Sequence, residues 1–420
     1  MNKTAYSNPE LVSPAGDWPS LHSAISAGAD AVYFGIKELN MRMAADNFDR
    51  LEMGKVVSLL QKNKKKAYLA LNTIFYDNDM NKVRRILRQA KAYGVDAVIA
   101  WDMGIIQLAR ELDIPVHLST QASVSNFFSV KLFSGLGIKR IVLARECPLK
   151  DIKDIVDKIK KHGLNCEIEV FVHGAMCVSI SGRCLLSQHF FSKSANRGEC
   201  SQPCRSEFLI KDMERNEEYV LGNGYVLSAK DLCTIDLIGQ LIEAGISAFK
   251  IEGRMRSPEY VKIVTSVYRQ AIGAFFKNKL NAALRNSLRE KLKTVFNRGF
   301  ETGFYLGKPD DLGSPGGIHG HEKVFLGNVT NFYSRIGVAE VLLKNARIRE
   351  GDEILIFGKS TAAFFSKISE LQIEHQAVKN ASKGDLVGIK LAAPVKPKDK
   401  VFLWRKRLDK IKKSDILMLD

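Results

Sequence analysis

The sequence predicts an α/β protein whose larger part is a (β/α)8 TIM-like barrel. Eight short apolar runs recur within the first 256 residues, and amphipathic segments separate them. The stretches GADAVYFG and GVDAVIAW are near copies, each a turn that feeds an apolar run. Such runs are typical of parallel strands buried on both faces, and eight βα units favour a closed barrel over an open sheet. No Gly-x-Gly-x-x-Gly motif follows the first run, which argues against a dinucleotide-binding fold.

The predicted strands and helices alternate regularly along this part of the chain. The strands cover residues 10–16, 31–35, 67–72, 97–102, 116–120, 140–146, 168–174 and 248–253. Amphipathic segments that predict helices include 49–64, 79–93, 148–162 and 257–276. Asp17 is a candidate N-cap for the helix after the first strand. Ser257 and Pro258 have the residue types that favour the start of a helix.

One connection is far longer than an ordinary βα loop. Residues 174–247 separate the seventh and eighth strands, and they hold five of the seven cysteines. A hairpin is expected in FLIKDMERNEEYVLG, with its turn at Arg215–Asn216, and a helix from Leu232 to Ala244. In a TIM barrel such an insertion lies on the C-terminal face, where the chemistry is done.

The rest of the chain changes character. Residues 299–322 are rich in glycine, and from Lys323 onward short period-two strands such as GVAEVLLKN, GDEILIFG, GDLVGIKL and DKVFLWRK predict a small antiparallel β-barrel. We therefore expect three parts. They are a catalytic barrel over 1–298 with its Cys-rich insertion at about 174–247, a linker over 299–322, and a β-barrel with a basic tail over 323–420.

Charge and hydropathy restrict the partners and the cellular location. The formal net charge of +17 suits a polyanionic partner, most simply nucleic acid, although lysines can also merely keep a surface soluble. No apolar run reaches the roughly 18 residues of a membrane span, and the N-terminus lacks the apolar core of a signal peptide. We therefore expect a cytoplasmic protein, in which clustered cysteines indicate metal binding or catalysis more often than disulfides.

The clustered cysteines do not follow a common metal-binding motif. They are Cys177, Cys184, Cys200, Cys204 and Cys233. Their spacing fits neither a zinc ribbon nor the compact ferredoxin run, so an iron–sulfur cluster, zinc and inert or catalytic thiols all remain open. A nucleophile paired with His173 is a further alternative, but no third orienting group is evident.

Polar residues at the C-terminal ends of the predicted strands form the candidate catalytic site. They are Asn72, Gln121, Arg145, Glu146, His173, Lys250, Glu252 and Arg254, with Glu169 earlier in strand seven and facing the interior. Such residues are costly at strand ends unless they have a role. Taken singly, each can belong to an internal salt-bridge network. As a group they indicate a site for an anionic small molecule.

The segment EIEVFVHGAMCVSISGRCLLS resembles the signature of the collagenase-like peptidase family of unknown catalytic type. The resemblance extends through PAGDWPSLHSAISAGADAVYFG, STQASVSN, LARE, RGECSQPCR, SAKDLC and FKIEGRMRSPEYV and into the C-terminal β-barrel. It implies an O2-independent hydroxylase, because the better understood members hydroxylate the wobble uridine of tRNA, a cytidine of ribosomal RNA, or the ubiquinone ring. Chain length and the single C-terminal β-barrel are most similar to the tRNA group, which makes 5-hydroxyuridine and is associated with prephenate as the hydroxyl donor.

The resemblance also implies a cofactor and roles for individual residues. A 4Fe-4S cluster is implied, with ligands at Cys177, Cys184, Cys200 and Cys233 and with Cys204 as the alternate. Cys147 and Cys166 are then core thiols. The two carboxylates of prephenate suit Arg145 and Arg254, and a Lys250/Glu252 pair can transfer protons.

The implied partners are the tRNA anticodon loop, a small anionic co-substrate and a possible paralogous protein, with no membrane. The basic stretch VKPKDKVFLWRKRLDKIKK, with Phe402 and Trp404, either contacts RNA or completes the last strand with its aromatics in the core. An rRNA cytidine hydroxylase and a collagenase-like peptidase are the alternative functions.

Overall fold

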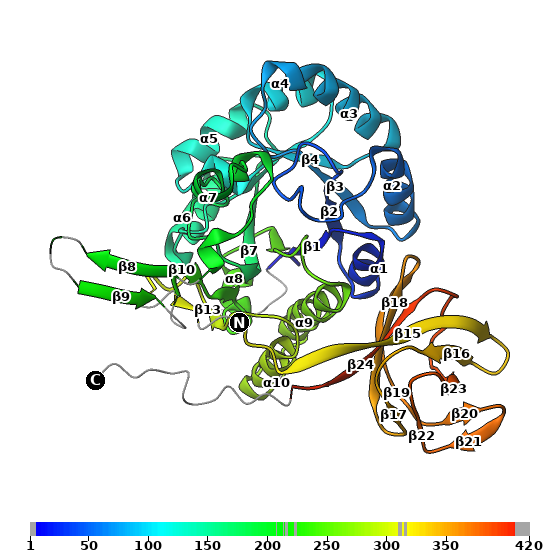
Figure 1. Cartoon of the computed structure of the whole chain (residues 1–420). Helices are drawn as coiled ribbons and strands as arrows, with labels where there is room; N and C mark the ends of the chain where they lie inside the picture. Colours follow the sequence, from blue (N-terminus) through cyan, green and yellow to red (C-terminus); the bar gives the residue numbers. More distant parts are fainter. Residues whose placement is uncertain are drawn as a thin grey trace.

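In the computed structural model a closed parallel barrel ringed by helices lies beside an antiparallel sheet of C-terminal residues (Figure 1). The structure describes residues 6–206, 208–212, 214, 217–221, 225–309, 313–314 and 317–407. Within them, no helix is both long and apolar enough to cross a membrane.

All eight predicted barrel strands are present. They are β1 (Glu10–Ala15), β2 (Ala31–Phe34), β3 (Lys66–Ala70), β4 (Ala97–Ala100), β5 (Val116–Leu118), β6 (Arg140–Val142), β7 (Glu167–Ala175) and β12 (Ala248–Ile251). Neighbouring strands pair in parallel, and β12 pairs with both β1 and β7, which closes the barrel. The predicted (β/α)8 fold is therefore confirmed.

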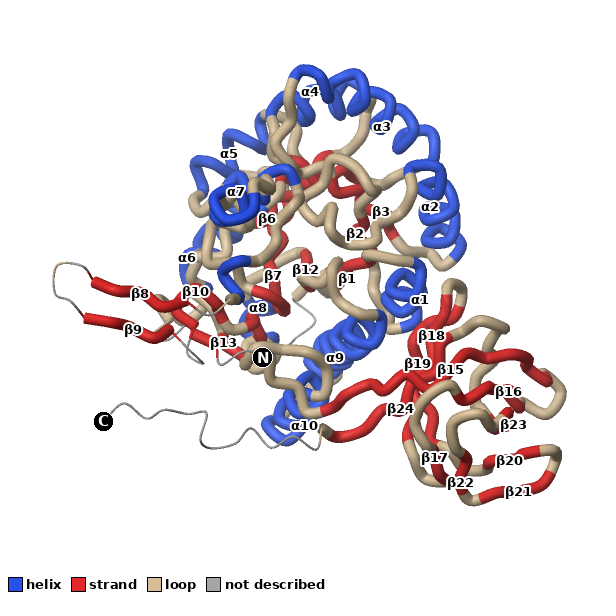
Figure 2. Tube along the Cα trace, viewed as in Figure 1, coloured by secondary structure: helices blue, strands red, loops and turns tan. Residues whose placement is uncertain are grey.

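Helices surround the barrel on its outside (Figure 2). They are α1 (Trp18–Ser26), α2 (Met53–Lys62), α3 (Met80–Tyr93), α4 (Met103–Glu111), α5 (Phe127–Gly135), α6 (Leu149–Lys161), α8 (Ile238–Glu243), α9 (Pro258–Phe276) and α10 (Ala282–Lys293). The Asp17 side chain accepts a hydrogen bond from Ser20 N at 2.8 Å, which confirms the predicted N-cap. Helix α9 begins with Pro258 as predicted, but Ser257 caps it without a side-chain hydrogen bond.

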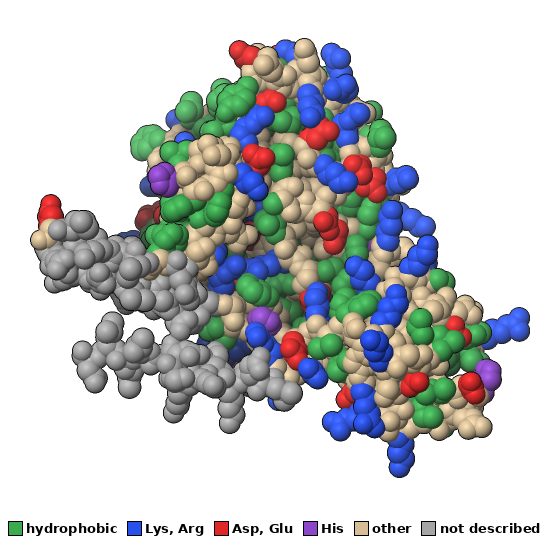
Figure 3. Space-filling view, viewed as in Figure 1, with side chains coloured by type: hydrophobic (Ala, Val, Ile, Leu, Met, Phe, Trp, Pro, Cys, Tyr) green, Lys and Arg blue, Asp and Glu red, His purple; other side chains and the backbone are tan. Residues whose placement is uncertain are grey.

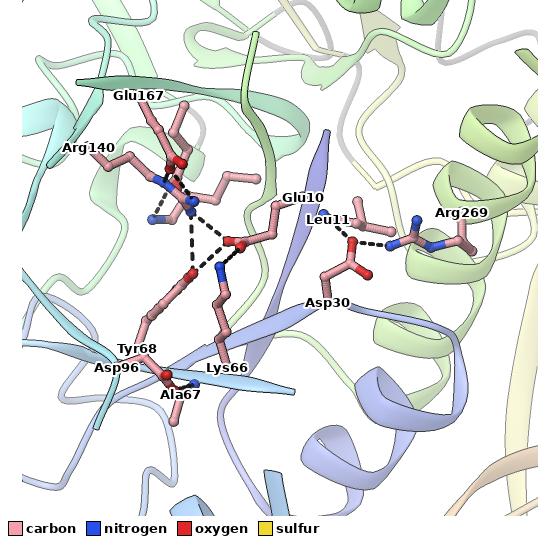
Figure 4. Close-up of polar contacts among 12 residues, drawn as sticks. Glu10, Leu11, Asp30, Lys66, Ala67, Tyr68, Asp96, Arg140, Glu167 and Arg269 are labelled. Carbon is pink, nitrogen blue, oxygen red and sulfur yellow. Dashed lines mark hydrogen bonds and ion pairs between the residues drawn. The ribbon is translucent and has the colours of Figure 1, made fainter. Parts of the chain in front are cut away.

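A polar network closes the N-terminal end of the barrel (Figure 4). The carboxylate of Glu10 accepts hydrogen bonds from Arg140 and Tyr68, both at 2.6 Å. Lys66 donates to it at 2.7 Å, and Arg140 also binds Glu167. Burial alone would raise the pKa of Glu10, but these donors lower it to about 2. Because these residues begin four different strands, they stabilise the barrel at the end away from the chemistry.

The insertion after β7 contains α7 (Leu186–Phe191), β8 (Phe208–Asp212), β9 (Glu217–Leu221), β10 (Tyr225–Ala229) and β11 (Asp231–Cys233). Strands β8 and β9 pair antiparallel, which confirms the hairpin, while its turn at Arg215–Asn216 lies outside the described residues. The helix predicted from Leu232 is wrong at its start. Strand β7 continues beyond the barrel as far as Ala175, and its free edge pairs with β11, so α8 begins only at Ile238.

The C-terminal residues form an eight-stranded antiparallel sheet around a core of its own. Its strands are β15 (His321–Tyr333), β16 (Val338–Leu343), β18 (Glu353–Gly358), β19 (Thr361–Lys367), β20 (Leu371–Ile373), β21 (Gln376–Val378), β23 (Leu386–Lys390) and β24 (Lys400–Lys406), and a separate pair joins β17 (Ile348–Arg349) to β22 (Asn380–Ala381). Trp404 is buried against Phe365, and Phe402 stacks on Phe357 at 5.2 Å. Trp404 is therefore buried and Phe402 half-buried, which favours the alternative that these aromatic rings pack as part of the last strand.

Two short strands lie within the predicted glycine-rich linker. They are β13 (Phe300–Glu301), which extends the barrel sheet beside β11, and β14 (Gly313–Ser314), which pairs with β10. The eight-stranded C-terminal sheet also contacts the barrel directly, because Ala363 N donates to Ser23 at 3.0 Å and Lys323 pairs with Glu259 at 2.7 Å. The three-part division of the chain stays a prediction.

Candidate active site at the barrel mouth

A small cavity of about 60 Å³ lies at the C-terminal ends of the barrel strands. We call it the mouth cavity, and its polar lining is Tyr33, Arg42, Asn72, Ser119, Thr120, Gln121, Arg145, Cys177, Ser181, Lys250, Glu252 and Arg254. These side chains come from the ends of many strands and the loops after them. This is the usual place of an active site in this fold.

The structure brings together most, but not all, of the predicted strand-end residues. Arg145, Lys250, Glu252 and Arg254 line the mouth cavity, as do Asn72 and Gln121. Glu169 lies beneath it, fully buried, where it accepts hydrogen bonds from Lys250 at 2.7 Å and Arg140 at 3.3 Å.

Besides Glu169 beneath it, two further predicted residues lie outside the cavity. Glu146 is exposed in the turn after β6. His173 is buried on the outer side of β7, with ring centroids 5.5 to 6.0 Å from those of Tyr260, Tyr268 and Phe300. Because His173 faces a helix and not the mouth, we remove it and Glu146 from the proposed site.

The predicted Lys250/Glu252 pair is not formed. Lys250 pairs with Glu169, whereas Glu252 accepts hydrogen bonds from Arg42 Nε at 3.3 Å and Nη2 at 3.2 Å. Arg42 lies in the loop after β2, beyond the strand end. Sequence reasoning missed it because only residues directly at strand ends were considered, and no motif marks it.

Among the residues that the structure describes, Glu252 is the one carboxylate that lines the mouth cavity. Burial alone would raise its pKa, but the positive charges of Arg42, Arg145 and Arg254 lower it below the ordinary value. Its Oε1 atom is held by Arg42, and its Oε2 atom lies 3.4 Å from the Tyr33 hydroxyl. Glu252 is therefore an ionised carboxylate with one oxygen facing the cavity wall.

Three buried donors at the mouth lack hydrogen-bond partners among the described residues. They are Nε of Arg145, Nη1 of Arg254 and Nε2 of Gln121. Burial lowers the pKa of Arg254 to about 10, because the charged guanidinium loses its water. An unsatisfied buried donor costs about 1–3 kcal/mol, more when it is charged. The mouth cavity is therefore suited to a ligand that brings negative charge and several acceptor oxygens.

The buried His173 makes a pH-dependent contribution to stability. Burial lowers its pKa from 6.5 to about 3, so the folded protein holds it neutral. That stability is complete above pH 6.5 and is lost as the pH falls towards 3. We expect the unfolding free energy of His173→Phe to fall less between pH 7 and pH 5 than that of the parent, by about 2 kcal/mol. Denaturant titration at both values measures this difference, and an equal fall in the two proteins would contradict it.

A second cavity, of about 220 Å³, adjoins the mouth cavity. We call it the cysteine cavity, because Cys177, Cys200 and Cys204 line it, together with Arg42, Arg205, Arg256 and Arg298. Burial raises the pKa of Cys204, and the neighbouring thiols of Cys177, Cys200 and Cys184 raise it further. The structure therefore brings four of the five clustered cysteines together.

Cys233 is the clustered cysteine that lies apart. It belongs to β11, is buried, and lines a different cavity with Asp236, Arg289 and Phe300. Its sulfur accepts a hydrogen bond from the Tyr268 hydroxyl at 3.9 Å. The structure thus favours Cys204, the predicted alternate, over Cys233 as the fourth member of the set.

Four thiolates are the usual ligand set of a 4Fe-4S cluster, one for each iron. Among the described residues, no three Cys, His, Asp or Glu side chains converge closely enough to hold one metal ion. In a 4Fe-4S cluster each thiolate binds a different iron, so the ligands surround a cavity without meeting at one point. Backbone N–H groups already donate to the sulfurs of Cys177 and Cys184, both at 3.4 Å, as is usual around such clusters.

The remaining two cysteines are core thiols. Burial raises the pKa of Cys147 to about 12 and that of Cys166 to about 11, so both stay protonated at neutral pH. Both are buried away from the two cavities, which agrees with the prediction for them.

Comparison with known proteins places this arrangement in a family. The model of peptidase family U32 matches residues 16–314, which is well over half of the chain. The chain belongs to peptidase family U32. This confirms the resemblance to collagenase-like peptidases that the sequence motifs indicated.

The relatives within the family carry names of two kinds. An uncharacterized protease of Methanocaldococcus jannaschii is 42% identical over 95% of this chain and 99% of that protein. A collagenase of Porphyromonas gingivalis is 38% identical over 95% of this chain and 98% of that protein. The tRNA hydroxylation protein P1 of Bacillus subtilis is 34% identical over 86% of each chain.

Proposed function

We propose that this chain is an RNA-modifying hydroxylase that converts the wobble uridine of tRNA to 5-hydroxyuridine. Prephenate supplies the oxygen in this proposal, and a 4Fe-4S cluster takes part. The relative named as a tRNA hydroxylation protein supports RNA as the substrate. The formal net charge of +17 supports it as well, and Lys and Arg side chains are spread over the face seen in Figure 3.

The observation that carries the proposal is the common wall of the two cavities. Arg42, Cys177 and Glu252 line both the mouth cavity and the cysteine cavity. An anionic ligand at the mouth would therefore lie directly beside the group held by the cysteines. A redox cofactor and its co-substrate require this proximity.

The side chains of the mouth can bind an anion and accept a proton. Arg145 is held in place by Ala175 O at 2.8 Å and by the Phe171 ring at 3.9 Å, so its free Nε is fixed in direction. Together with Arg254 it can bind the two carboxylates of prephenate. Replacement of C5–H of uridine by C5–OH is a two-electron oxidation, so the C–O bond of prephenate must break and the carbon that loses the oxygen must take up the two electrons. Glu252 Oε2 can accept the proton that leaves C5. The ion pair with Glu169 at 2.7 Å fixes the position of the Lys250 side chain at the mouth.

The cysteine cavity would hold the cluster through Cys177, Cys184, Cys200 and Cys204. When bound, the cluster would supply electron transfer to the co-substrate. Metal binding requires deprotonated thiols, and the guanidinium of Arg205, which lines this cavity, opposes the rise that burial causes in the pKa of Cys204.

The turn that carries Ser181 is a candidate for movement when a substrate enters. Ser181 lines the mouth cavity from a turn in which Arg183 N donates to Ile180 O at 2.9 Å. A cavity of about 150 Å³ holds benzene, so the roughly 60 Å³ of the mouth is too small to enclose a ring completely. Movement of this turn would enlarge the cavity for a six-membered ring.

A peptidase activity, which the names of two relatives state, has less support from the geometry. Cys177 would be the nucleophile, but the nearest histidine in sequence, His173, is buried against Tyr268 and hydrogen-bonds at 3.3 Å to that hydroxyl. A nucleophilic thiol needs its base within hydrogen-bond reach.

The test is nucleoside mass spectrometry of tRNA from cells that lack this gene and its homologues. We expect 5-hydroxyuridine and its derivatives to disappear and to return when the parent gene is restored. Glu252→Gln should fail to restore them, whereas the exposed Glu243→Gln on α8, a matched control, should succeed. Unchanged 5-hydroxyuridine in the deletion strain would contradict the proposal, and loss of 5-hydroxycytidine from ribosomal RNA would favour the rRNA alternative.

A further inference from the structure

We propose that two aromatic rings, Trp101 beside the mouth cavity and Tyr76 in the loop after β3, are stacking platforms for unpaired RNA bases next to the target nucleotide. This inference rests on the proposed function, because it assumes that the substrate is RNA. It adds the residues that would distinguish a single-stranded loop from a duplex. Each ring is covered on one face by an arginine from the Cys-rich insertion.

Trp101 is attached to the wall of the mouth cavity. It follows β4, and its indole N–H donates to Asn72 O at 3.0 Å. The guanidinium of Arg183 lies 5.1 Å from its ring centroid and donates to Gln121 O at 3.3 Å. Asn72 and Gln121 both line the cavity and are joined by a hydrogen bond of 3.0 Å. Trp101 and Arg183 therefore each contact a residue that lines the mouth cavity.

Tyr76 forms a second pair of the same kind in the loop after β3. Its side chain is 60% exposed, so burial does not explain an aromatic residue at this position. The guanidinium of Arg197 lies 4.6 Å from the ring centroid. Arg197 is fixed there by Ile74 O at 3.0 Å and by the carboxylate of Asp79. The Arg197 guanidinium thus lies against one face of the Tyr76 ring, and the exposed side of the ring is open to a partner.

Unpaired nucleic-acid bases fit these two sites better than other ligands. Single-stranded RNA is bound by stacking its bases on aromatic rings and guanidinium planes beside a positively charged groove. Arg183 belongs to the turn whose movement would enlarge the mouth cavity, and that movement would free the covered face of Trp101 for a base. A base-paired stem cannot stack in this way, because its bases already stack on one another.

The test compares two RNAs with the full-length protein. One is an anticodon stem–loop, and the other is the same stem closed into a fully paired duplex. We expect Trp101→Ala and Tyr76→Ala each to weaken binding of the stem–loop by about 5- to 150-fold. Duplex binding and the slope of affinity against salt concentration should not change, because no phosphate contact is lost.

Matched variants separate stacking from misfolding. Trp101→Phe keeps an aromatic ring and should bind the stem–loop nearly as well as the parent. Tyr93→Ala removes a partly exposed tyrosine at the end of α3 remote from the mouth, and it should have no effect. Thermal unfolding of each variant checks that the fold is intact.

The outcomes also separate this inference from the proposed function. If both alanine variants bind the stem–loop as the parent does, the stacking platforms are overturned while the RNA hydroxylase proposal stands. If the variants lose stem–loop and duplex binding equally, the surface contacts phosphates, and the inference is again overturned. If the parent binds neither RNA, the proposed function fails together with the inference.

Discussion

Serine at Cys204 should remove the iron from the anaerobically purified protein, whereas serine at Cys233 should leave it. The same loss is expected at Cys177, Cys184 and Cys200. The reason is their position, because Cys177, Cys200 and Cys204 line the cysteine cavity and Cys184 lies close to Cys204, whereas Cys233 lines another cavity. The measurement is iron and acid-labile sulfide per chain, with about four of each in the parent if a 4Fe-4S cluster is bound.

Cys147→Ser provides the matched control for this series. It replaces a buried thiol that lines neither cavity, so iron content should equal that of the parent. Circular dichroism of the four ligand variants separates loss of the cluster from loss of the barrel. Retention of iron in Cys204→Ser together with its loss in Cys233→Ser would contradict the ligand set that the structure favours. It would support the set implied by the family resemblance.

Arg254→Gln should lower kcat/KM by about 30- to 4,000-fold while leaving the protein as stable as the parent or slightly more stable. Truncation of one partner of a buried, hydrogen-bonded charge pair costs about 2–5 kcal/mol of binding. In the free protein, however, Nη1 of Arg254 has no partner among the described residues, so burial of this guanidinium lowers the stability of the fold. Removal of this charge should not destabilise the fold.

Arg140→Gln is the matched comparison, since it removes an equally buried guanidinium from the opposite end of the same barrel. Arg140 is paired with Glu10, Glu167 and Glu169, so its loss leaves the buried Glu10 and Glu169 with one cation each, Lys66 and Lys250. We expect a destabilisation of about 3–5 kcal/mol. Steady-state kinetics and denaturant titration of both variants check the two expectations. A stability loss in Arg254→Gln with unchanged kcat/KM would show that Arg254 is structural.

The barrel could be predicted because its signals are local. Each strand is a short apolar run beside an amphipathic segment, and the predicted spans lie within a few residues of the observed strands. The predicted start of the helix at Leu232 was wrong because the structure there does not depend on a local signal. Asp231–Cys233 is a strand only because β7 extends beyond the barrel and offers a free edge, and sequence periodicity carries no information on a pairing partner about 57 residues away.

The site was predicted in part, for a related reason. Arg145, Lys250, Glu252 and Arg254 follow predicted strands, so the barrel topology alone places them at the mouth. The partners of these charges are set by distances across the barrel. Arg42 hydrogen-bonds to Glu252, which lies 210 residues away in the sequence. Lys250 pairs with Glu169 and not with Glu252, although Glu252 is nearer in the sequence.

The sequence by itself determined the eight-stranded barrel, the Cys-rich insertion on its catalytic face, the family and the basic charge. These follow from periodicity, composition and motifs that are contiguous in the chain. Only the tertiary structure decided that Cys204 and not Cys233 joins the other three thiols, that His173 faces a helix, and that Arg42 completes the mouth. Each of these depends on which side of a strand a residue faces and on contacts between distant segments, and both are fixed by packing.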